Sequence, residues 1–296
     1  MAVCAGAHVA YSSLPMHLLQ ILILAVVQGT AELLPVSSSA HVIVAEKLMG
    51  LDPTAPEMTL LLVMLHTGTM LSVIVYFWRS WRESYFSSAE TLRRRSLQLV
   101  AGTAATSVVG LILLQAIKQF FARNGPAFEI EQLFGDARLM AASLAAVGVL
   151  IIVASRVDRA TGNDISIRSA AWIGAVQGLC LPFRGFSRSG ATISAGLVLG
   201  VVRRRAEEFS FALAVVLTPA VIAREVWRLH KAHDAASIAG AGGLGAMAGS
   251  YLLATLMSFA AGLVALRWLS NWLEQGRWYL FGVYCLIASG VVLAVG

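Results

Sequence analysis

The chain contains two related stretches, VQGTAELLPVSSSAH at residues 27–41 and VQGLCLPFRGFSRSGAT at residues 176–192. Both begin with Val-Gln-Gly, and both run through a short apolar segment into a break of proline, serine and other polar residues. The two triplets stand 149 residues apart in a chain of 296 residues. This repeat predicts a molecule made of two related halves, each with one interrupted segment.

Apolar residues flank each break, over about residues 17–49 for the first and 169–202 for the second. Each flank has about 10 to 17 residues, fewer than the roughly 20 that a helix needs to cross a bilayer. Proline interrupts a helix, and irregular backbone at membrane depth is tolerated only inside protein or beside water. The pattern favours two re-entrant helical hairpins over the alternative of two kinked full-length helices.

The rest of the chain has the composition of a polytopic membrane protein. Apolar residues make up 58% of it and charged residues only 13%, whereas a typical soluble domain has about 25% charged residues. This composition excludes a soluble enzyme, a disordered chain and, with three cysteines, a disulfide scaffold. Six further apolar runs are long enough to cross a bilayer. We place them near residues 58–78, 97–116, 137–155, 206–227, 242–266 and 278–296.

Each half is predicted to hold one hairpin and three crossings, over about residues 12–156 and 167–296 of a single membrane domain. Because three crossings is an odd number, the second half must be inverted relative to the first. The hairpins then enter from opposite sides and meet near the midplane, where broken helices build a site at the repeat interface. The predicted fold is an all-α integral membrane protein with six transmembrane helices and two re-entrant hairpins in an inverted-topology repeat.

The basic residues predict the orientation. In this arrangement 13 of the 22 Lys and Arg residues fall on the connectors of one face. They are Arg79, Arg82, Arg93, Arg94, Arg95, Arg156, Arg159, Arg168, Arg203, Arg204, Arg205, Arg267 and Arg277. The positive-inside rule makes that face cytoplasmic and places both termini outside. The first 15 residues have no Lys or Arg, so they lack the basic start of a signal peptide, and we expect the chain to be retained whole.

The first break carries a carboxylate at membrane depth. Gln28 and Glu32 are four residues apart and share one helix face. An ionisable residue in this place is costly and is a functional candidate by default. The plainer alternative is that Glu32 forms a structural ion pair, with Arg188 of the other break as its partner.

Three serines and a histidine follow. Serine caps helix starts, which explains one or two of Ser37, Ser38 and Ser39 but not all three together with His41. His41 can serve as acid, base or nucleophile because its pKa lies near neutrality, or it can be a packed residue. We interpret His66, in the middle of a predicted crossing, as structural.

The second break suits an anion. Gly185 lets the backbone approach a ligand closely, and the hydroxyls of Ser187, Ser189 and Thr192 beside a helix N-terminus suit phosphate oxygens. Arg188 adds a planar, permanently charged fork that matches phosphate. Such a charge in an intramembrane turn is too costly to be incidental.

Together the breaks predict phosphoryl chemistry at a membrane-embedded site, with Arg184 as a second cation. Glu32, with Gln28 as a neutral oxygen ligand, can hold a divalent cation that completes its shell with phosphate oxygens and water. No Cys/His spacing suggests zinc, and the sequence has no Walker loop. The attacking group is Ser38 activated by His41, a water, or His41 itself. We favour Ser38 and leave the other two open.

At these residues the sequence resembles the bacitracin-resistance-type undecaprenyl-diphosphate phosphatases. The family's first motif, Glu/Gln-x-x-x-Glu followed by Pro-Val-Ser-Ser and a His, is matched by residues 28–41. Its second motif is Pro-Gly-x-Ser-Arg-Ser-x-x-Thr, and residues 185–192 match it from the glycine onward. Gln28 is a variant of the usual Glu and removes one charge from the metal site. Phe183-Arg184 stands where the family has a proline before the glycine.

The resemblance implies hydrolysis of undecaprenyl diphosphate to undecaprenyl phosphate and inorganic phosphate at the periplasmic face of the bacterial inner membrane. That reaction recycles the lipid carrier of peptidoglycan synthesis and confers bacitracin resistance. The resemblance also implies a Mg²⁺ or Ca²⁺ requirement. The expected partners are the polyprenyl diphosphate and membrane lipids, with a homodimer also considered and no nucleic acid. The competing prediction is a secondary transporter or lipid flippase, since inverted repeats with broken helices are transporter features.

Overall fold

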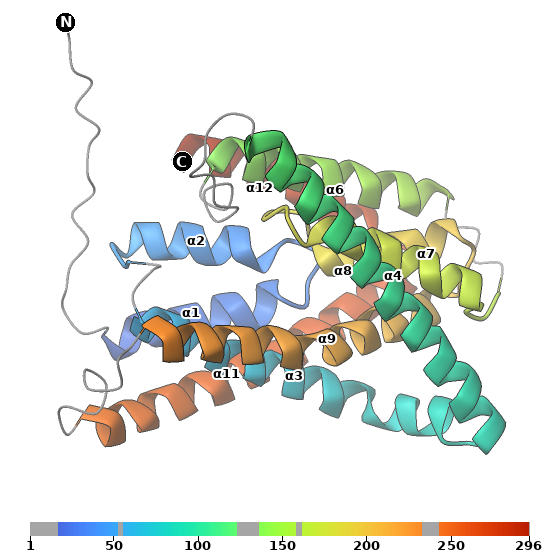
Figure 1. Cartoon of the computed structure of the whole chain (residues 1–296), viewed down its shortest axis with the longest axis horizontal. Coiled ribbons are helices and arrows are strands. Elements are labelled where there is room, and N and C mark those ends of the chain that lie inside the picture. The colour runs from blue at the N-terminus through green and yellow to red at the C-terminus, as the bar shows by residue number, and fades with distance from the viewer. Residues whose placement is uncertain (1–16, 53–55, 123–135, 158–161, 233–242, 296) are drawn as a thin grey trace, which may run out of the picture.

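The computed structural model describes residues 17–52, 56–122, 136–157, 162–232 and 243–295, and every structural statement below refers to them. Cys4, Arg123, Arg159 and the N-terminus predicted to lie outside fall beyond these ranges. Figure 1 labels the helices α1 (Leu18–Ala31), α2 (Ser38–Leu48), α3 (Pro56–Tyr85), α4 (Ala89–Ala122), α6 (Ala137–Val157), α7 (Ile167–Cys180), α8 (Arg188–Val198), α9 (Arg203–Ala232), α11 (Gly243–Glu274) and α12 (Tyr279–Val295). The predicted all-α class is confirmed over the described residues.

Four helices are long and apolar enough to cross a membrane. These candidate spans are 58–85, 89–120, 137–157 and 249–274, in α3, α4, α6 and α11. The other two predicted crossings coincide with α9, which contains Pro219, and with α12, which has 17 residues. The structure therefore shows a helical protein of the integral membrane type, with four of its helices meeting the length and composition of a span.

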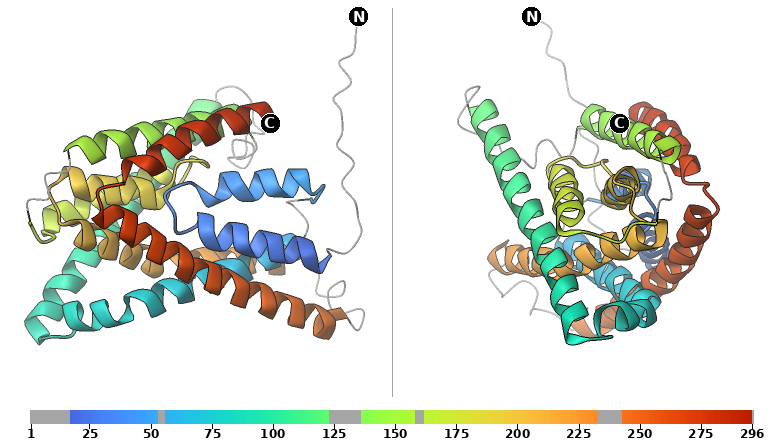
Figure 2. Two further views of the ribbon diagram at one scale, coloured as in Figure 1. Left: turned by 180° about the vertical axis from the view of Figure 1, so that it is seen from behind. Right: turned by 90° about the vertical axis from the view of Figure 1, so that its right-hand side faces the viewer.

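Two short helix pairs occupy the regions predicted to form hairpins. The first pair, α1 and α2, has 14 and 11 residues, and the second pair, α7 and α8, has the same two lengths. A 14-residue helix is about 21 Å long, which is too short to cross a hydrocarbon core of about 30 Å. The pairs approach from opposite ends of the molecule, and their turns meet in its interior (Figures 1 and 2).

The repeated Gln-Gly dipeptide marks the place where each hairpin presses against a long helix. A Cβ atom added to Gly29 of α1 would lie 2.6 Å from the carbonyl oxygen of Ser258 in α11. A Cβ atom added to Gly178 of α7 would lie 2.8 Å from the carbonyl oxygen of Thr106 in α4. Only glycine permits these backbone approaches. Each hairpin is thus docked on a helix of the other half of the chain.

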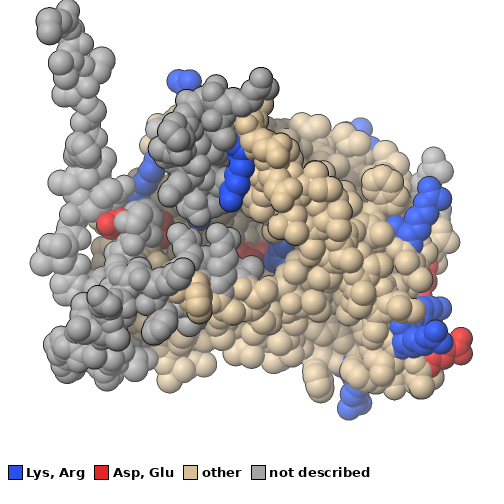
Figure 3. Space-filling model, in the orientation of Figure 1, with Lys and Arg blue, Asp and Glu red and all other residues tan. Residues whose placement is uncertain are grey.

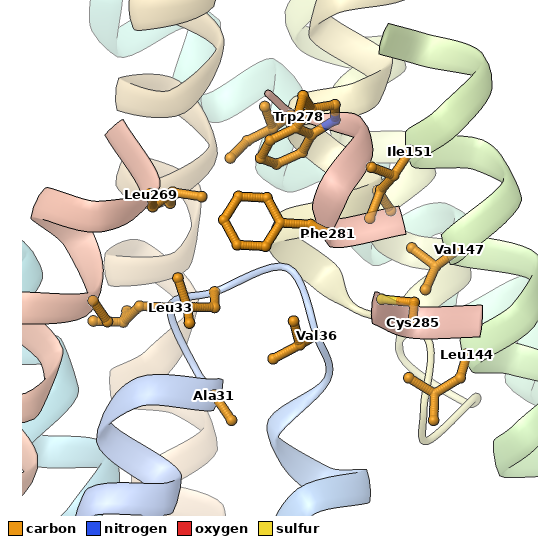
Figure 4. Packing of buried hydrophobic residues seen from close by; sticks show 14 of the residues in the cluster. Ala31, Leu33, Val36, Leu144, Val147, Ile151, Leu269, Trp278, Phe281 and Cys285 are labelled. Atoms are coloured by element: carbon orange, nitrogen blue, oxygen red, sulfur yellow. The ribbon is translucent and has the colours of Figure 1, made fainter. Parts of the chain in front are cut away.

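The largest apolar cluster holds the turn of the first hairpin in place. Leu33 and Val36 of that turn lie between Leu269 of α11 and Val147 of α6, below the ring of Phe281 (Figure 4). All five side chains are buried. Close packing of this kind leaves the turn few alternative positions, so the polar residues that it carries are fixed as well.

The basic connectors gather at one end of the molecule. Arg95, at the start of α4, donates two hydrogen bonds to Asp164 before α7, at 2.8 and 2.9 Å. Arg203, at the start of α9, donates to the carbonyl of Glu274 at the end of α11, at 3.0 Å. Burial opposes the ionisation of Asp164, but the hydrogen bonds from Arg95 outweigh it and hold the pKa of this carboxyl below its ordinary value.

Figure 3 shows the same distribution on the surface. Lys and Arg side chains collect near the end where α3 runs into α4, and uncharged residues cover the middle of the visible face. Other Lys and Arg side chains appear toward the opposite end of this view, so the charge is concentrated near α3 and α4 without being confined there.

Candidate active site

A cavity of about 230 Å³ opens where the turns of the two hairpins meet. Polar side chains from both breaks line it together with a few apolar ones. The lining residues are Ala31, Glu32, Ser37, Ser38, Ser39, Gln177, Cys180, Leu181, Phe183, Arg184, Phe186, Ser187, Arg188 and Ser189. Two segments about 150 residues apart in sequence thus form one site.

Glu32 is the centre of the polar contacts. It follows α1 directly as its C-terminal cap residue. Its Oε1 accepts a hydrogen bond from Arg188 Nη2 at 3.0 Å, which joins the two hairpins. Its Oε2 accepts hydrogen bonds from Ser38 Oγ at 2.6 Å and from Gln28 Nε2 at 3.1 Å. The predicted pairing of Glu32 with Arg188 is therefore present, and it coexists with a contact to a serine hydroxyl.

Ser38 is aimed at Glu32 by an unusual turn. The preceding Ser37 has φ +67° and ψ +97°, and it is the one non-glycine residue with positive φ in the described chain. A residue held in such a sparsely populated region costs on the order of 1–3 kcal/mol, and such residues cluster at functional sites. The Ser38 hydroxyl donates its proton in a short hydrogen bond to the Glu32 carboxylate, at 2.6 Å. A serine in this geometry can lose its proton to Glu32 as it attacks.

Arg188 stands at the start of α8, and Ser187 is the N-cap of that helix, accepting a hydrogen bond from the Gly190 amide at 3.2 Å. The N-terminal end of a helix carries a partial positive charge. This partial charge adds to the positive charge of the Arg188 guanidinium at the cavity wall. Arg184 of the same break also lines the cavity. The second hairpin thus brings positive charge to the cavity into which the first brings a carboxylate and hydroxyls.

The other predicted serines also lie at the cavity. Ser39 Oγ contacts Ser37 Oγ at 3.2 Å and accepts from the Gly185 amide at 3.4 Å. Ser189 Oγ donates to the carbonyl of Leu34 at 3.3 Å. These contacts tie one break to the other, so the hydroxyls hold the two turns together as well as facing the cavity.

Two predicted substrate-binding residues do not line the cavity. Thr192 is fully buried, and its hydroxyl contacts Ser210 of α9 at 2.5 Å and donates to the carbonyl of Arg188 at 2.8 Å. Gly185, at φ +97°, packs so closely that an added Cβ would lie 2.4 Å from the carbonyl oxygen of Met140. Both residues are packed against neighbouring helices and support the conformation of the second break without facing the cavity.

The predicted pair of Ser38 and His41 is not brought together. His41 Nδ1 contacts the carbonyl oxygen of Ser37 at 2.8 Å, and its Nε2 contacts the hydroxyl of Tyr284 at 2.6 Å. No hydrogen bond joins His41 to Ser38 or to Glu32 within the described residues. Glu32, and not His41, is in position to act as the base for Ser38.

Two further residues belong to the site. His66 of α3 has its Nε2 3.8 Å from Glu32 Oε2 and 3.3 Å from Gln28 Nε2. From the sequence we interpret His66 as structural, whereas the structure places it beside the carboxylate of the candidate site. Gln177 is the repeat counterpart of Gln28, lines the cavity, and has a buried Oε1 without a hydrogen-bond partner.

The donor set beside the cavity fits an oxygen-preferring divalent cation. Glu32 supplies a carboxylate, and Gln28, whose Nε2 faces Glu32, presents its oxygen when the amide turns over. Over the described residues no three His, Cys, Asp or Glu side chains gather around one point. A cation here takes its other ligands from phosphate oxygens and water, as Mg²⁺ commonly does.

Comparison with known proteins gives a consistent result. The family model for "Bacitracin resistance protein BacA" matches residues 21–292. "Undecaprenyl-diphosphatase 2" of Acinetobacter baylyi is 60% identical over 280 residues, covering 95% of this chain and 98% of that protein. "Undecaprenyl-diphosphatase" of Desulfosudis oleivorans is 34% identical over 306 residues, covering 95% and 99%. "Undecaprenyl-diphosphatase 2" of Burkholderia ambifaria is 33% identical over 289 residues, covering 93% and 95%.

Proposed function

Because this chain belongs to the bacitracin resistance protein BacA family, we propose that it is an undecaprenyl-diphosphatase, which hydrolyses undecaprenyl diphosphate to undecaprenyl phosphate and inorganic phosphate. One observation carries the assignment to this cavity. Glu32 accepts hydrogen bonds from both Ser38 and Arg188. A candidate base thus contacts a candidate nucleophile from its own hairpin and an anion-binding cation from the other hairpin.

In the proposed mechanism the terminal phosphate binds at Arg188 and the N-terminal end of α8. Ser38 Oγ attacks the terminal phosphorus while Glu32 takes the hydroxyl proton. The bond from that phosphorus to the bridging oxygen breaks, and undecaprenyl phosphate leaves with the electron pair. Glu32 passes the hydroxyl proton to the departing undecaprenyl phosphate. It then takes a proton from the water that attacks the phosphoserine, the bond from phosphorus to Ser38 Oγ breaks, and Ser38 Oγ recovers the proton from Glu32 as inorganic phosphate leaves. Positioned positive charge stabilises the developing charge in both steps.

Glu32 and Gln28 are the residues that we propose to hold Mg²⁺ or Ca²⁺. A bound divalent cation neutralises phosphate charge and orients its oxygens. This chain has one carboxylate in the pair, since position 28 is Gln, so the cation would take its remaining ligands from phosphate oxygens and water. Arg184 and Arg188 line the same cavity and contribute positive charge toward the phosphate. The donor chemistry and the proximity of the two side chains support the proposal.

A second groove supplies a place for the polyprenyl chain. It has a volume of about 190 Å³ and is formed by α2, α6 and α12. Apolar side chains dominate it, among them Val44, Leu144, Ile287 and Val291. Ala40 and His41 line the groove and directly follow Ser38 and Ser39 of the cavity in α2. A diphosphate in the cavity can therefore extend its tail along this groove.

We further propose six crossings and two re-entrant hairpins in an inverted repeat, within the bacterial inner membrane. The equal lengths of the hairpin helices and their approach from opposite ends support the repeat. The gathering of basic connectors at one end supports a cytoplasmic face there, with both termini and the opening of the site on the periplasmic side. A homodimer remains a prediction from the sequence. The family name fits a role in bacitracin resistance through recycling of the lipid carrier.

One assay tests the function. The solubilised full chain is given a polyprenyl diphosphate with Mg²⁺, and phosphate release is compared among wild type, Arg188→Ala and Glu32→Ala. Arg138→Ala, an exposed arginine at the start of α6, is the matched control. We expect release by wild type and the control and its loss in the other two. A wild-type protein that releases no phosphate, yet moves the lipid in proteoliposomes, would support the transporter instead, since opposed broken helices also suit transport.

A further inference from the structure

The turn that aims Ser38 is held by an unusual hydrogen bond. In a regular helix the carbonyl of Ser37 would accept from the backbone amide of His41, but this distance is 3.4 Å. The ring Nδ1 of His41 lies closer to the same carbonyl, at 2.8 Å. The imidazole therefore makes the stronger contact to the residue with positive φ. Without it, the carbonyl of Ser37 would keep only the stretched backbone contact.

The second nitrogen of the ring is anchored on a distant helix. A carbonyl oxygen only accepts hydrogen bonds, so Nδ1 carries the ring proton and Nε2 is left as an acceptor. The Tyr284 hydroxyl of α12 lies 2.6 Å from Nε2. The two rings are nearly parallel, at 13° with centroids 5.6 Å apart. Both nitrogens of His41 are thus engaged, one by α12 and one by the Ser37 turn.

From this geometry we infer that His41 and Tyr284 are positioning residues that lock the Ser37 turn and thereby hold Ser38 Oγ against Glu32. The inference rests on the proposed phosphatase function. It assigns His41 a role without proton transfer or nucleophilic attack, and it gives Tyr284 a part in the reaction. Apolar residues surround the pair in the groove of α2, α6 and α12.

Substitutions at His41 separate positioning from chemistry. His41→Asn keeps a side-chain N–H near the place of Nδ1 but has neither a base nor a nucleophile, whereas His41→Ala has none of the three. We expect His41→Ala to lower kcat about 100-fold, because a 1 Å misplacement can cost that much, and to change KM much less, since His41 is one of nine residues that line the groove. His41→Asn should recover most of this loss. Equal and complete inactivity of two folded variants would show that His41 performs chemistry and would overturn the inference.

A double-mutant cycle tests Tyr284. Tyr284→Phe removes one hydrogen bond, and we expect a loss of kcat of about 5-fold in the wild type and almost none in the His41→Ala background, because the chain of contacts is already broken there. Tyr279→Phe is the matched control, since Tyr279 lies on the same helix and is equally exposed, at 44%. Equal losses from Tyr284→Phe in both backgrounds would contradict a shared path through His41.

A readout without turnover keeps this inference separate from the proposed function. In the ¹⁵N spectrum of histidine-labelled protein, we expect His41, assigned by its absence in His41→Asn, in the form protonated at Nδ1. Tyr284→Phe should shift its Nε2 signal, and Tyr279→Phe should leave it unchanged. A ring protonated at Nε2 alone would overturn the inference even if the enzyme is active. A wild type with the expected ring but no phosphate release would instead count against the proposed function.

Discussion

The two hairpins have the same dimensions and opposite chemistry. Each pairs a 14-residue helix with an 11-residue helix, and each docks through a glycine on a long helix of the other half. The first carries a carboxylate, serines and the strained Ser37, whereas the second carries Arg188 behind a relaxed N-cap, Ser187, at φ −61°. The two hairpins thus share one backbone arrangement, and they differ in the chemistry of the few residues in each turn.

The sharpest way to break the comparison is to neutralise the first hairpin while preserving its shape. Glu32→Gln keeps the size of the side chain but removes the base for Ser38 and the charge that faces Arg188. General-base catalysis contributes about 10²–10⁴-fold, and we expect a loss in kcat of this order in the phosphate-release assay. Glu83→Gln, in an exposed ion pair with Arg79, is the control and should keep full activity. An active Glu32→Gln protein would remove Glu32 from the chemistry.

The shared docking of the hairpins can be tested through stability. Alanine at Gly29 or Gly178 places a Cβ within 3 Å of a backbone carbonyl, and overpacking of this kind costs about 1–3 kcal/mol. We expect both substitutions to lower the Tm in detergent by similar amounts. Gly290→Ala in α12, where an added Cβ meets nothing within 4 Å, should not lower it. A drop for only one hairpin glycine would show that the two docking contacts are not equivalent.

The two repeated glutamines should differ in importance. Gln28 donates to Glu32, while Gln177 Oε1 has no partner within the described chain. Loss of a hydrogen bond to a charged group costs about 1.5–3 kcal/mol, so Gln28→Leu should lower kcat/KM at least about 10-fold, and Gln177→Leu should lower it less. Gln28→Glu should lower the concentration of Mg²⁺ needed for half-maximal rate, because it adds a carboxylate ligand. An unchanged Mg²⁺ requirement would place the cation away from Gln28.

The smallest effect is expected at the base of the second hairpin. Arg95 pairs with Asp164 just before α7, and this pair lowers the pKa of Asp164. A lowered carboxyl pKa contributes stability above its ordinary value of 3.8, and this contribution is lost as the pH falls through the folded pKa. Because Asp164 is partly exposed, solvent screening keeps the effect to about 1 kcal/mol or less. Asp164→Asn should therefore lower the Tm slightly at pH 7 and by less at pH 3, which is below the ordinary pKa of 3.8. An equal decrease at both pH values would exclude linkage to this ionisation.

Much of this arrangement could be predicted because its signals are local in the sequence. The length of the apolar arms and the proline and serine breaks predicted where short helices turn back. The polar residues of the two breaks predicted that Glu32 and Arg188 face each other, and the hydrogen bond between them confirms this contact. The repeated Val-Gln-Gly located both hairpins, and the structure explains the glycine through its contact with a long helix.

Other parts depend on contacts that the sequence does not encode locally. His66 and Tyr284 reach the first hairpin from helices 38 and 243 residues away from their partners, so no spacing rule could connect them. Ser38 and His41 stand three residues apart, which suggested a pair, but the strained Ser37 turns Ser38 toward Glu32 and leaves His41 against Tyr284. Thr192 fits the phosphate motif yet faces Ser210, because helix packing decides which side of a turn meets the cavity.

The central claim is that the first hairpin supplies the attacking hydroxyl at Ser38. It is tested most directly by rapid quenching of the full chain with a polyprenyl diphosphate labelled in its terminal phosphate, followed by peptide mapping. The account predicts a transient phosphoserine at residue 38, absent in Ser38→Ala and also absent or much slower to form in Glu32→Gln. Label on His41, or steady turnover by Ser38→Ala at the wild-type rate, would contradict it.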